Sequence, residues 1–312
     1  MGQLDPPLGG DQGVDKFWNF ILSMIEDARR DVGHVHAIVF PETAMGWRTF
    51  EALAQRLRDH SNVELLISGL FDFVLPRDGE PQLRQGNFAA MAQFAASVDG
   101  RRSYNTSVRE KHHRWKLDRG QIETYALGAS LDPQFRWWEE ITIESRSVDI
   151  FTIRGCATIT ALICEDLARH DPCQELVRAI GPNLVFALLM DGAQLRDRWP
   201  GRYATVLADD PGSSVLTFTS LGLIERTNDA GVLPKSRKVG LWRDDRGQVT
   251  ELSVPPDAHG LCITLQPTEF VEYTLDGRSD DGGTQSWRLA AIRPIKGNGD
   301  GTGAIVDGRW PG

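Results

Sequence analysis

Hydrophobic residues along this chain alternate between two spacings, one typical of an amphipathic helix and one typical of a buried strand. Between residues 15 and 32 the apolar side chains recur at helical spacing, and "HVHAIVFPE" (34–42) then forms a short β-branched run that Pro41 ends. The same pair of patterns returns in "FEALAQRLRDH" (50–60) and "VELLISGLFDF" (63–73). The pattern therefore predicts helices that feed buried strands.

Further along, the pattern predicts strand pairs and more alternation. Residues 87–111 and 148–164 each divide into two strand-like runs, joined at Asp99-Gly100 and at Arg154-Gly155. We expect a helix in 172–181, a strand in 183–190, a helix in 201–210, a strand in 214–224 and a hairpin in 238–254. Helices and strands in this order favour a layered α/β architecture. With no strong linker, we expect one domain over residues 1–266 and a C-terminal extension over 267–312.

Composition narrows the class of protein. The net charge of −9 gives the whole molecule no attraction for nucleic acid or anionic lipid. The four cysteines form no C-x-x-C pair, which is typical of free thiols in a reducing cytoplasm. No apolar run approaches the roughly 20 residues that cross a bilayer, so we expect no membrane insertion.

Three chemically reactive residues each follow a predicted strand. Glu42 ends "AIVFPE", Lys111 follows "YNTSVRE", and Cys164 ends "ATITALIC" just before a predicted helix. Strand ends hold side chains in place while the adjoining loops leave them accessible. A thiol at a helix start has a lowered pKa, a carboxylate can remove its proton, and a lysine can stabilise the charge that develops on the substrate. Together these residues indicate acyl transfer through a thioester.

The order of these motifs resembles the nitrilase superfamily of carbon–nitrogen hydrolases. The resemblance rests on "FPE" (40–42), "KHH" (111–113) and "CED" (164–166), and extends to "LISG" (66–69) and to Asn87. It implies a four-layer αββα sandwich, and dimers or larger homo-oligomers, with neither an organic cofactor nor a metal. It also implies that Glu42 is the general base, Lys111 the stabiliser of the tetrahedral intermediate and Cys164 the nucleophile, with Glu123 as a second glutamate beside the lysine.

The substrate implied is a small molecule with an amide or carbamoyl group, rather than a nitrile. We expect Glu165, through its backbone N–H, and His113 to contact that substrate, and Asp191 and Gly192, which follow the strand "FALLM", to line its pocket. Two alternatives stay open on sequence grounds. One is an acyltransferase with the same three residues, and the other is a nitrilase-like binding or regulatory module, as part of a larger polypeptide or complex.

Three segments depart from the family pattern or suggest other sites. Family members open with an apolar strand that residues 1–16 lack, and we expect residues 287–295 to supply an edge strand beside 34–42, in the same subunit or in a neighbouring one. The alternative is an ordinary strand at a subunit interface. The basic run 109–119 is either a solvated loop or a surface that attracts an anionic substrate or nucleic-acid phosphate. His34 and His36 form an H-x-H pair of a kind that binds zinc, but they lie at the start of their strand, away from Glu42, so we expect no metal.

Overall fold

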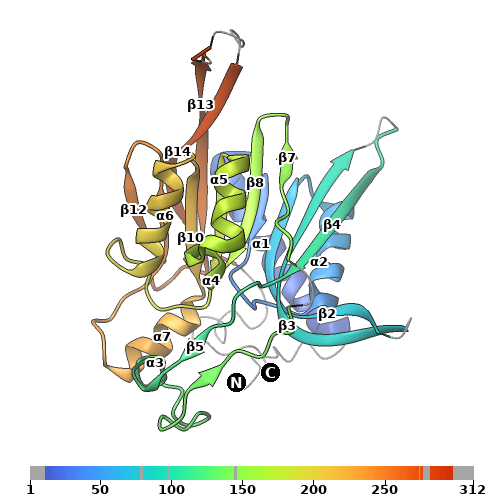
Figure 1. The fold of residues 1–312 in the computed structure, drawn as a ribbon. Helices are drawn as coiled ribbons and strands as arrows, with labels where there is room; N and C mark the ends of the chain where they lie inside the picture. The colour runs from blue at the N-terminus through green and yellow to red at the C-terminus, as the bar shows by residue number, and fades with distance from the viewer. Residues whose placement is uncertain are drawn as a thin grey trace.

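The computed structural model describes residues 11–77, 80–96, 99–143, 146–273, 275–276 and 282–297. Residues 1–10 and the part of the predicted C-terminal extension beyond residue 297 lie outside these ranges. Two main β-sheets form the centre of the molecule, and helices lie outside them (Figure 1). The mixed α/β class predicted from the sequence is confirmed.

The first sheet contains four strands in the order β1-β2-β3-β4, which cover Ala37–Val39, Leu65–Arg77, Glu80–Ala96 and Arg102–Glu110. β1 is parallel to β2, with Ala37 opposite Leu65, and the other neighbours are antiparallel. Helices α1 (Asp11–Val32) and α2 (Trp47–His60) precede β1 and β2. Each of the two helix–strand pairs predicted in this half is therefore present.

The second sheet contains six strands in the order β12-β11-β10-β9-β8-β7. Its central strands β8 (Ala157–Ile163), β9 (Leu184–Leu189) and β10 (Ser214–Thr219) are parallel, so their carboxyl ends meet at one edge of the sheet. The outer strands are antiparallel to their neighbours and cover Phe151–Ile153 (β7), Lys238–Arg243 (β11) and Val249–Ser253 (β12). Between them run helices α4 (Glu165–Ala168), α5 (Glu175–Ile180), α6 (Trp199–Asp209) and α7 (Leu221–Ala230).

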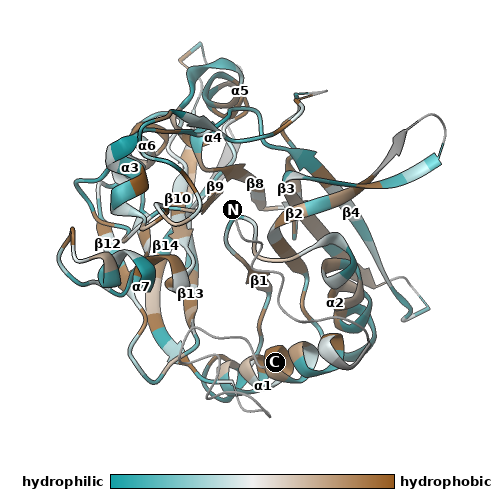
Figure 2. Cartoon of the chain, turned by 90° about the horizontal axis from the view of Figure 1, so that it is seen from below, coloured by the Kyte–Doolittle hydropathy of each residue, from teal (hydrophilic) through white to brown (hydrophobic). Residues whose placement is uncertain are grey.

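The two faces of the first sheet belong to two different hydrophobic cores, because successive side chains of a strand point to opposite faces. On β2, Leu66 and Leu70 face the helices α1 and α2, whereas Leu65 and Ile67 face the second sheet. α6 packs on β10 and β11 from the other side, and β3 contacts β8. In Figure 2 the hydrophobic strand segments lie inside and the helices at the periphery. The order of layers is thus helix, sheet, sheet, helix.

Several local predictions need correction. Residues 214–224 do not form one strand, because Ser220 accepts a hydrogen bond from the N–H of Leu223 and begins α7. The helix predicted at 172–181 is shorter, since a turn of π-helix over His170–Gln174 precedes α5. A small hairpin of β5 (Lys116–Leu117) and β6 (Trp137–Trp138), with α3 (Arg119–Thr124) between its strands, was not predicted. Strands of two residues are too short to give a period.

The C-terminal segment forms a long antiparallel hairpin, β13 (Gly260–Glu272) with β14 (Gly282–Ile295). Residues 287–295 are a strand, as predicted, but within the described ranges they pair with β13 and not with β1, so the predicted position beside 34–42 of the same subunit is wrong. The predicted domain boundary at residue 266 falls inside β13. Phe20 and Met24 of α1 contact the base of this hairpin, and Trp287 packs on the core of the second sheet.

Among the described residues, no helix is both long and apolar enough to span a lipid bilayer.

We predict that the C-terminal hairpin unfolds together with the rest of the chain. The Trp287 indole donates to Asn183 Oδ1 at 3.2 Å, and its carbonyl accepts from Ser214 Oγ at 2.7 Å. Trp287→Ala should lower the free energy of unfolding by about 2 kcal/mol, because it removes a large side chain from a packed surface. Urea unfolding followed by circular dichroism measures this change. Trp138→Ala, at a side chain 59% exposed, is the control and should change it by less than about 0.5 kcal/mol. A separate early transition in the native protein would contradict the prediction.

Candidate functional site

Two glutamates, a lysine and an asparagine form a buried polar cluster between the sheets. Lys111, just after β4, donates from Nζ to Glu42 Oε1 at 3.1 Å and to Glu139 Oε2 at 2.7 Å. Asn87 Nδ2, from β3, lies 2.7 Å from Glu42 Oε1 and 2.6 Å from Glu139 Oε1. One cation and one amide therefore hold both carboxylates.

The second oxygen of Glu42 is available. Within the described chain, Glu42 Oε2 is buried and has no hydrogen-bond partner, while Oε1 takes both donors. Gly69 fixes the backbone behind it, because a Cβ at Gly69 would lie 2.4 Å from Glu42 Cα and from Thr43 N. This close approach explains the glycine in "LISG". Because Oε1 takes both donors, Oε2 is the carboxylate oxygen of Glu42 that is free to accept a proton.

Burial and charge set the protonation of this cluster. Burial raises the pKa of the Glu42 carboxyl, and the charge of Lys111 opposes that rise. Burial alone would lower the pKa of the Lys111 ammonium, but the negative charges of Glu42 and Glu139 and the hydrogen bond to Glu139 raise it well above its ordinary value. Lys111 is therefore a fixed cation, and Glu42 is more basic than a glutamate in water.

Cys164 lies at the end of β8 in an uncommon backbone conformation. Its φ of 44° and ψ of −109° are strained for a residue with a side chain. The helix that follows, α4, has only four residues, so it supplies little of the expected helix-start field. Burial and then the charge of Glu42 raise the pKa of the Cys164 thiol well above its usual value. The predicted thiolate is thus corrected: at rest this side chain is a neutral thiol.

Asp166 connects the lysine strand to the cysteine strand. Its carboxylate accepts from Arg109 Nη1 at 3.0 Å, from the backbone N–H of His112 at 3.0 Å, and lies 3.1 Å from His113 Nδ1. Arg109 also donates to the carbonyl of Ala161 in β8 at 2.8 Å. These contacts fix the segment that carries Lys111 beside the segment that carries Cys164.

The same contacts correct the interpretation of the basic run 109–119. Arg109, Lys111 and His112 are buried, so the run is neither a solvated loop nor a continuous basic surface. Lys116 and Arg119 are exposed, with Lys116 over the ring of Trp138 and Arg119 paired with an acidic side chain. Arg114, Lys116 and Arg119 are exposed, so recognition of an anionic substrate or of phosphate by this part of the run stays a prediction.

Asp191 lies at the end of β9, on the sheet edge where β8 ends at Cys164. Its Oδ1 accepts from the Tyr125 hydroxyl, from Arg198 Nη2 at 2.8 Å and from the N–H of Gly192 at 2.8 Å. Its Oδ2 is buried and without a hydrogen-bond partner among the described residues. The charge of Asp191 also raises the pKa of Cys164, so the two side chains share one environment.

Glu123 is not part of the cluster. It lies in α3 with its side chain 54% exposed and accepts from Arg119 at 2.8 Å. Glu139 takes the predicted place beside Lys111, and its Oε2 also accepts the backbone N–H of Trp115 at 3.0 Å. Glu139 follows the two-residue strand β6, so it too stands at a strand end. Its position at the end of a strand could have pointed to Glu139, but a strand of two residues cannot be recognised in the sequence.

Two other predicted site residues have structural partners. His113 contacts Asp166 rather than the space around Glu42 Oε2. The Glu165 carboxylate lies 3.3 Å from Arg169 Nη2, and its charge contributes to the raised pKa of Cys164. Gly192 is restricted by Arg198, whose Nη1 would be 2.8 Å from an added Cβ.

No family model matches this chain, and no curated protein matches it. Among solved structures it is similar to a mutant of the Nesterenkonia AN1 amidase from the nitrilase superfamily, with 15% identity over 78% of this chain and 82% of that one (TM-score 0.46). It is similar to Saccharomyces cerevisiae Nit3, of branch 10 of that superfamily, with 12% identity over 76% and 79% (TM-score 0.46).

A third similar structure is the glutamine-dependent NAD+ synthetase of Acinetobacter baumannii, with 13% identity over 81% of this chain but only 42% of the synthetase (TM-score 0.45). Similarity at this level concerns the course of the backbone and says nothing of substrate. In fold, the chain is similar to these nitrilase-superfamily structures.

We predict that Asp166 stabilises the fold at neutral pH. Asp166→Asn leaves buried Arg109 without its counter-ion, so the free energy of unfolding at pH 7 should fall by about 3 kcal/mol. Hydrogen bonds from His113 and Arg109 and the charge of Arg109 outweigh burial and lower the pKa of the carboxyl. Its stabilisation is therefore complete above the unfolded pKa of about 3.9 and lost as pH falls through the lower folded value.

Urea unfolding at pH 7, 5 and 3 measures this dependence. The difference between native and variant should be constant from pH 7 to 5 and should shrink at pH 3. Asp209→Asn, at an exposed ion pair with Arg243, is the control and should have little effect. An equal loss in both variants would argue against the anchoring role of Asp166.

Proposed function

We propose that this protein is a cysteine-dependent hydrolase of a non-peptide carbon–nitrogen bond, in an amide or carbamoyl group of a small molecule. The observation that carries the proposal is the state of Glu42, whose Oε1 is held by Lys111 and Asn87 while its buried Oε2 is free. A carboxylate oriented in this way beside a neutral cysteine thiol is a general base prepared for one proton.

In the proposed reaction, Glu42 Oε2 takes the proton of Cys164 as the sulfur bonds to the substrate carbonyl carbon. The carbonyl π electrons move to oxygen, and the Lys111 ammonium stabilises the resulting oxyanion. The carbon–nitrogen bond then breaks, Glu42 returns the proton to the leaving nitrogen, and a thioester remains. Water, deprotonated by Glu42, attacks the thioester, and Cys164 leaves with that proton as the acid product is released.

The raised pKa of Cys164 is compatible with this sequence. A neutral thiol needs a base at the moment of attack, and burial makes Glu42 a stronger one. Glu139 does not reach the reacting atoms in this scheme. It is a positioning residue that holds Lys111 through the 2.7 Å contact and that is itself held by Trp115 N–H.

We assign Asp191 to the substrate pocket, with Gly192 beside it. Its free Oδ2 can accept an N–H of the substrate, while Tyr125 and Arg198 fix the other oxygen. Glu165 remains a candidate through its backbone N–H, next to the sulfur-bearing residue. An acyltransferase would use the same residues with an amine in place of water.

We also propose, as the sequence suggested, that the chain forms homo-oligomers. Exposed hydrophobic side chains on the outer helices support this proposal: Leu176 and Ile180 on α5, and Val206 on α6.

We predict that Cys164→Ala abolishes hydrolysis while the circular dichroism spectrum is retained. Glu42→Gln should reduce kcat/KM by at least about a hundredfold, because the base is lost. In the native protein kcat/KM should rise with pH through the raised pKa of Glu42, since only the carboxylate accepts the thiol proton, and Glu42→Gln should lack that rise.

A panel of aliphatic amides, aromatic amides and N-carbamoyl compounds provides the assay. Cys173→Ser is the control thiol, because Cys173 is buried against His112, away from Glu42. Turnover that persists in Cys164→Ala would refute the proposed nucleophile. Absence of turnover on every class of this panel would favour the binding-module alternative.

We predict that Glu139→Gln lowers kcat by about tenfold or more, because Lys111 loses a charged partner that orients it. The charge of Glu139 also raises the pKa of Glu42, so the acidic limb of the kcat/KM profile should move to lower pH. Glu123→Gln is the matched control and should change neither quantity, since Glu123 is exposed in α3. A lower kcat with an unmoved acidic limb would show that Glu139 acts on folding alone.

A further inference from the structure

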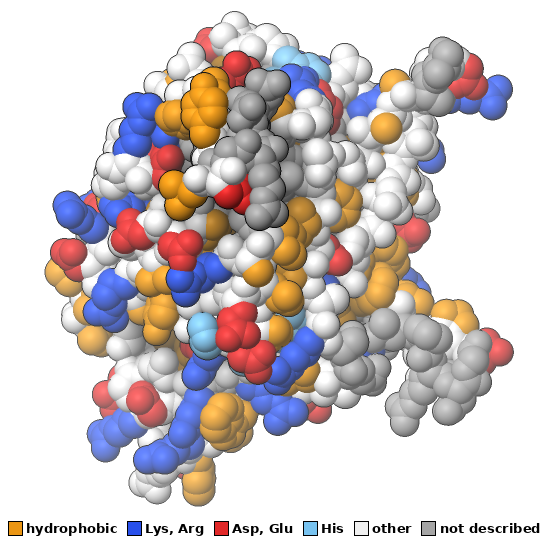
Figure 3. All heavy atoms as spheres, turned by 45° about the horizontal axis from the view of Figure 1, so that its top comes forward, with side chains coloured by type: hydrophobic (Ala, Val, Ile, Leu, Met, Phe, Trp, Pro, Cys, Tyr) orange, Lys and Arg blue, Asp and Glu red, His pale blue; other side chains and the backbone are white. Residues whose placement is uncertain are grey.

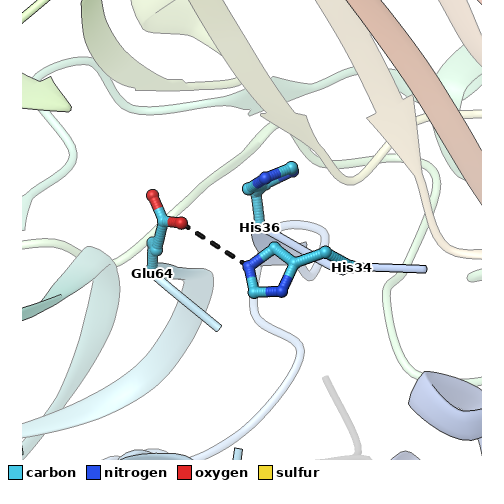
Figure 4. A group of neighbouring side chains, drawn as sticks. All are labelled: His34, His36 and Glu64. Carbon is cyan, nitrogen blue, oxygen red and sulfur yellow. Dashed lines mark ion pairs between the residues drawn. The ribbon is translucent and has the colours of Figure 1, made fainter. Parts of the chain in front are cut away.

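A second group of polar side chains lies at the opposite end of β1 from Glu42. His36 immediately precedes β1 and Glu64 immediately precedes β2, and the carbonyl of His36 accepts the N–H groups of Glu64 at 2.8 Å and Leu65 at 3.0 Å. These bonds place His36 and Glu64 side by side in the parallel register. His34, two residues earlier, has its ring on the same side (Figure 4).

The three side chains converge closely. His34 Nε2 lies 3.5 Å from Glu64 Oε1, the two imidazole rings are 4.4 Å apart, and one ligand atom from each residue lies within 4.8 Å of the others. Donors around a tetrahedral Zn²⁺, each about 2.0–2.1 Å from the ion, are roughly 3.4 Å apart. Small side-chain rotations would bring this set to that spacing.

The imidazoles are free to act as ligands. His34 Nε2 is buried and makes no hydrogen bond within the described ranges. On the face shown in Figure 3, acidic and basic side chains are interspersed with histidine, so no large patch of one charge dominates it.

A second group of possible metal ligands in the described chain consists of His112, Asp166 and Cys173. Its ligand atoms are not free in this way. His112 Nδ1 contacts Cys173 Sγ at 3.0 Å, and its Nε2 accepts the N–H of Ser147 at 3.1 Å. Asp166 is occupied by Arg109 and the two histidines. Its members are fully buried and already bonded, so that group stabilises the fold.

We propose that His34, His36 and Glu64 bind one divalent transition-metal ion, for which Zn²⁺ fits the two imidazoles and one carboxylate, with water completing the coordination. This differs from the expectation of no metal, which concerned a catalytic ion. Glu42 is six residues from His36, about 20 Å along an extended chain. The ion is therefore a structural or regulatory ligand and takes no part in the chemistry at Cys164.

Arg154 is the group that competes with the metal. From the turn between β7 and β8, its guanidinium donates to both oxygens of Glu64, with Nε 2.8 Å from Oε2. The Arg154 side chain is 55% exposed and can move into solvent. If Zn²⁺ replaced Arg154, the contact of Arg154 with Glu64 between the two sheets would be lost. The ion would instead bridge His36 and Glu64.

Isothermal titration of chelator-treated full-length protein with zinc chloride tests the proposal. The native chain should bind one Zn²⁺ at this site, with a rise in Tm. His36→Gln and Glu64→Gln should each weaken that binding at least about tenfold. His170→Gln is the matched control, because His170 is an exposed histidine 2.9 Å from a carboxylate elsewhere on the surface, and it should bind as the native chain does.

Arg154→Gln tests the same site through an expected gain of Zn²⁺ affinity. Misfolding would lower the affinity, so it cannot produce this result. It should bind Zn²⁺ several-fold more tightly than the native chain, because it removes a competing cation. Cys164→Ser should retain this binding. Native chain without bound zinc, unchanged affinity in His36→Gln, or binding that disappears only in Cys164→Ser would each overturn the proposal.

Discussion

The buried ammonium of Lys111 is the interaction on which the candidate site depends. A charge with 1% of its side chain exposed needs counter-ions, and the two carboxylates of Glu42 and Glu139 supply them. Two carboxylates against one cation leave a net negative charge among apolar strands. A proton on Cys164 at rest keeps this charge from growing by one more unit. Burial and mutual repulsion raise the pKa values of both Cys164 and Glu42.

The fold supplies this arrangement through the ends of its strands. Glu42, Lys111 and Cys164 each follow a strand, and the parallel strands β8 and β9 bring Cys164 and Asp191 to one edge. The two sheets then hold the two halves of the site against each other. Asp166 links the loop after β4 to the loop after β8, so the separation of the sheets and the geometry of the site are maintained by the same buried carboxylate.

The sequence predicted those features that depend on local pattern. The period of apolar residues predicted the main strands. The strand-end context selected Glu42, Lys111 and Cys164 as candidates, and the structure brings the first two into contact. Glu123 was chosen instead of Glu139 because the connection from Lys111 to the second glutamate folds through α3 and a two-residue strand, which leave no periodic signal. The protonation of Cys164 was also missed, since burial by distant segments outweighs a one-turn helix. Likewise, the partners of Arg109 lie more than fifty positions away.

The neutral thiol of Cys164 has a further consequence for the chemical durability of the protein. Peroxides and other oxidants attack the thiolate, and the product ladder from sulfenic to sulfonic acid begins there. Cys164 is 4% exposed as a residue, and its protonated sulfur offers these reagents little of the reactive form. In the proposed reaction Glu42 takes the proton only as a carbonyl carbon arrives, so the sulfur would become nucleophilic when the substrate already occupies the site. The same burial that delays activation therefore preserves the residue against oxidative damage between turnovers.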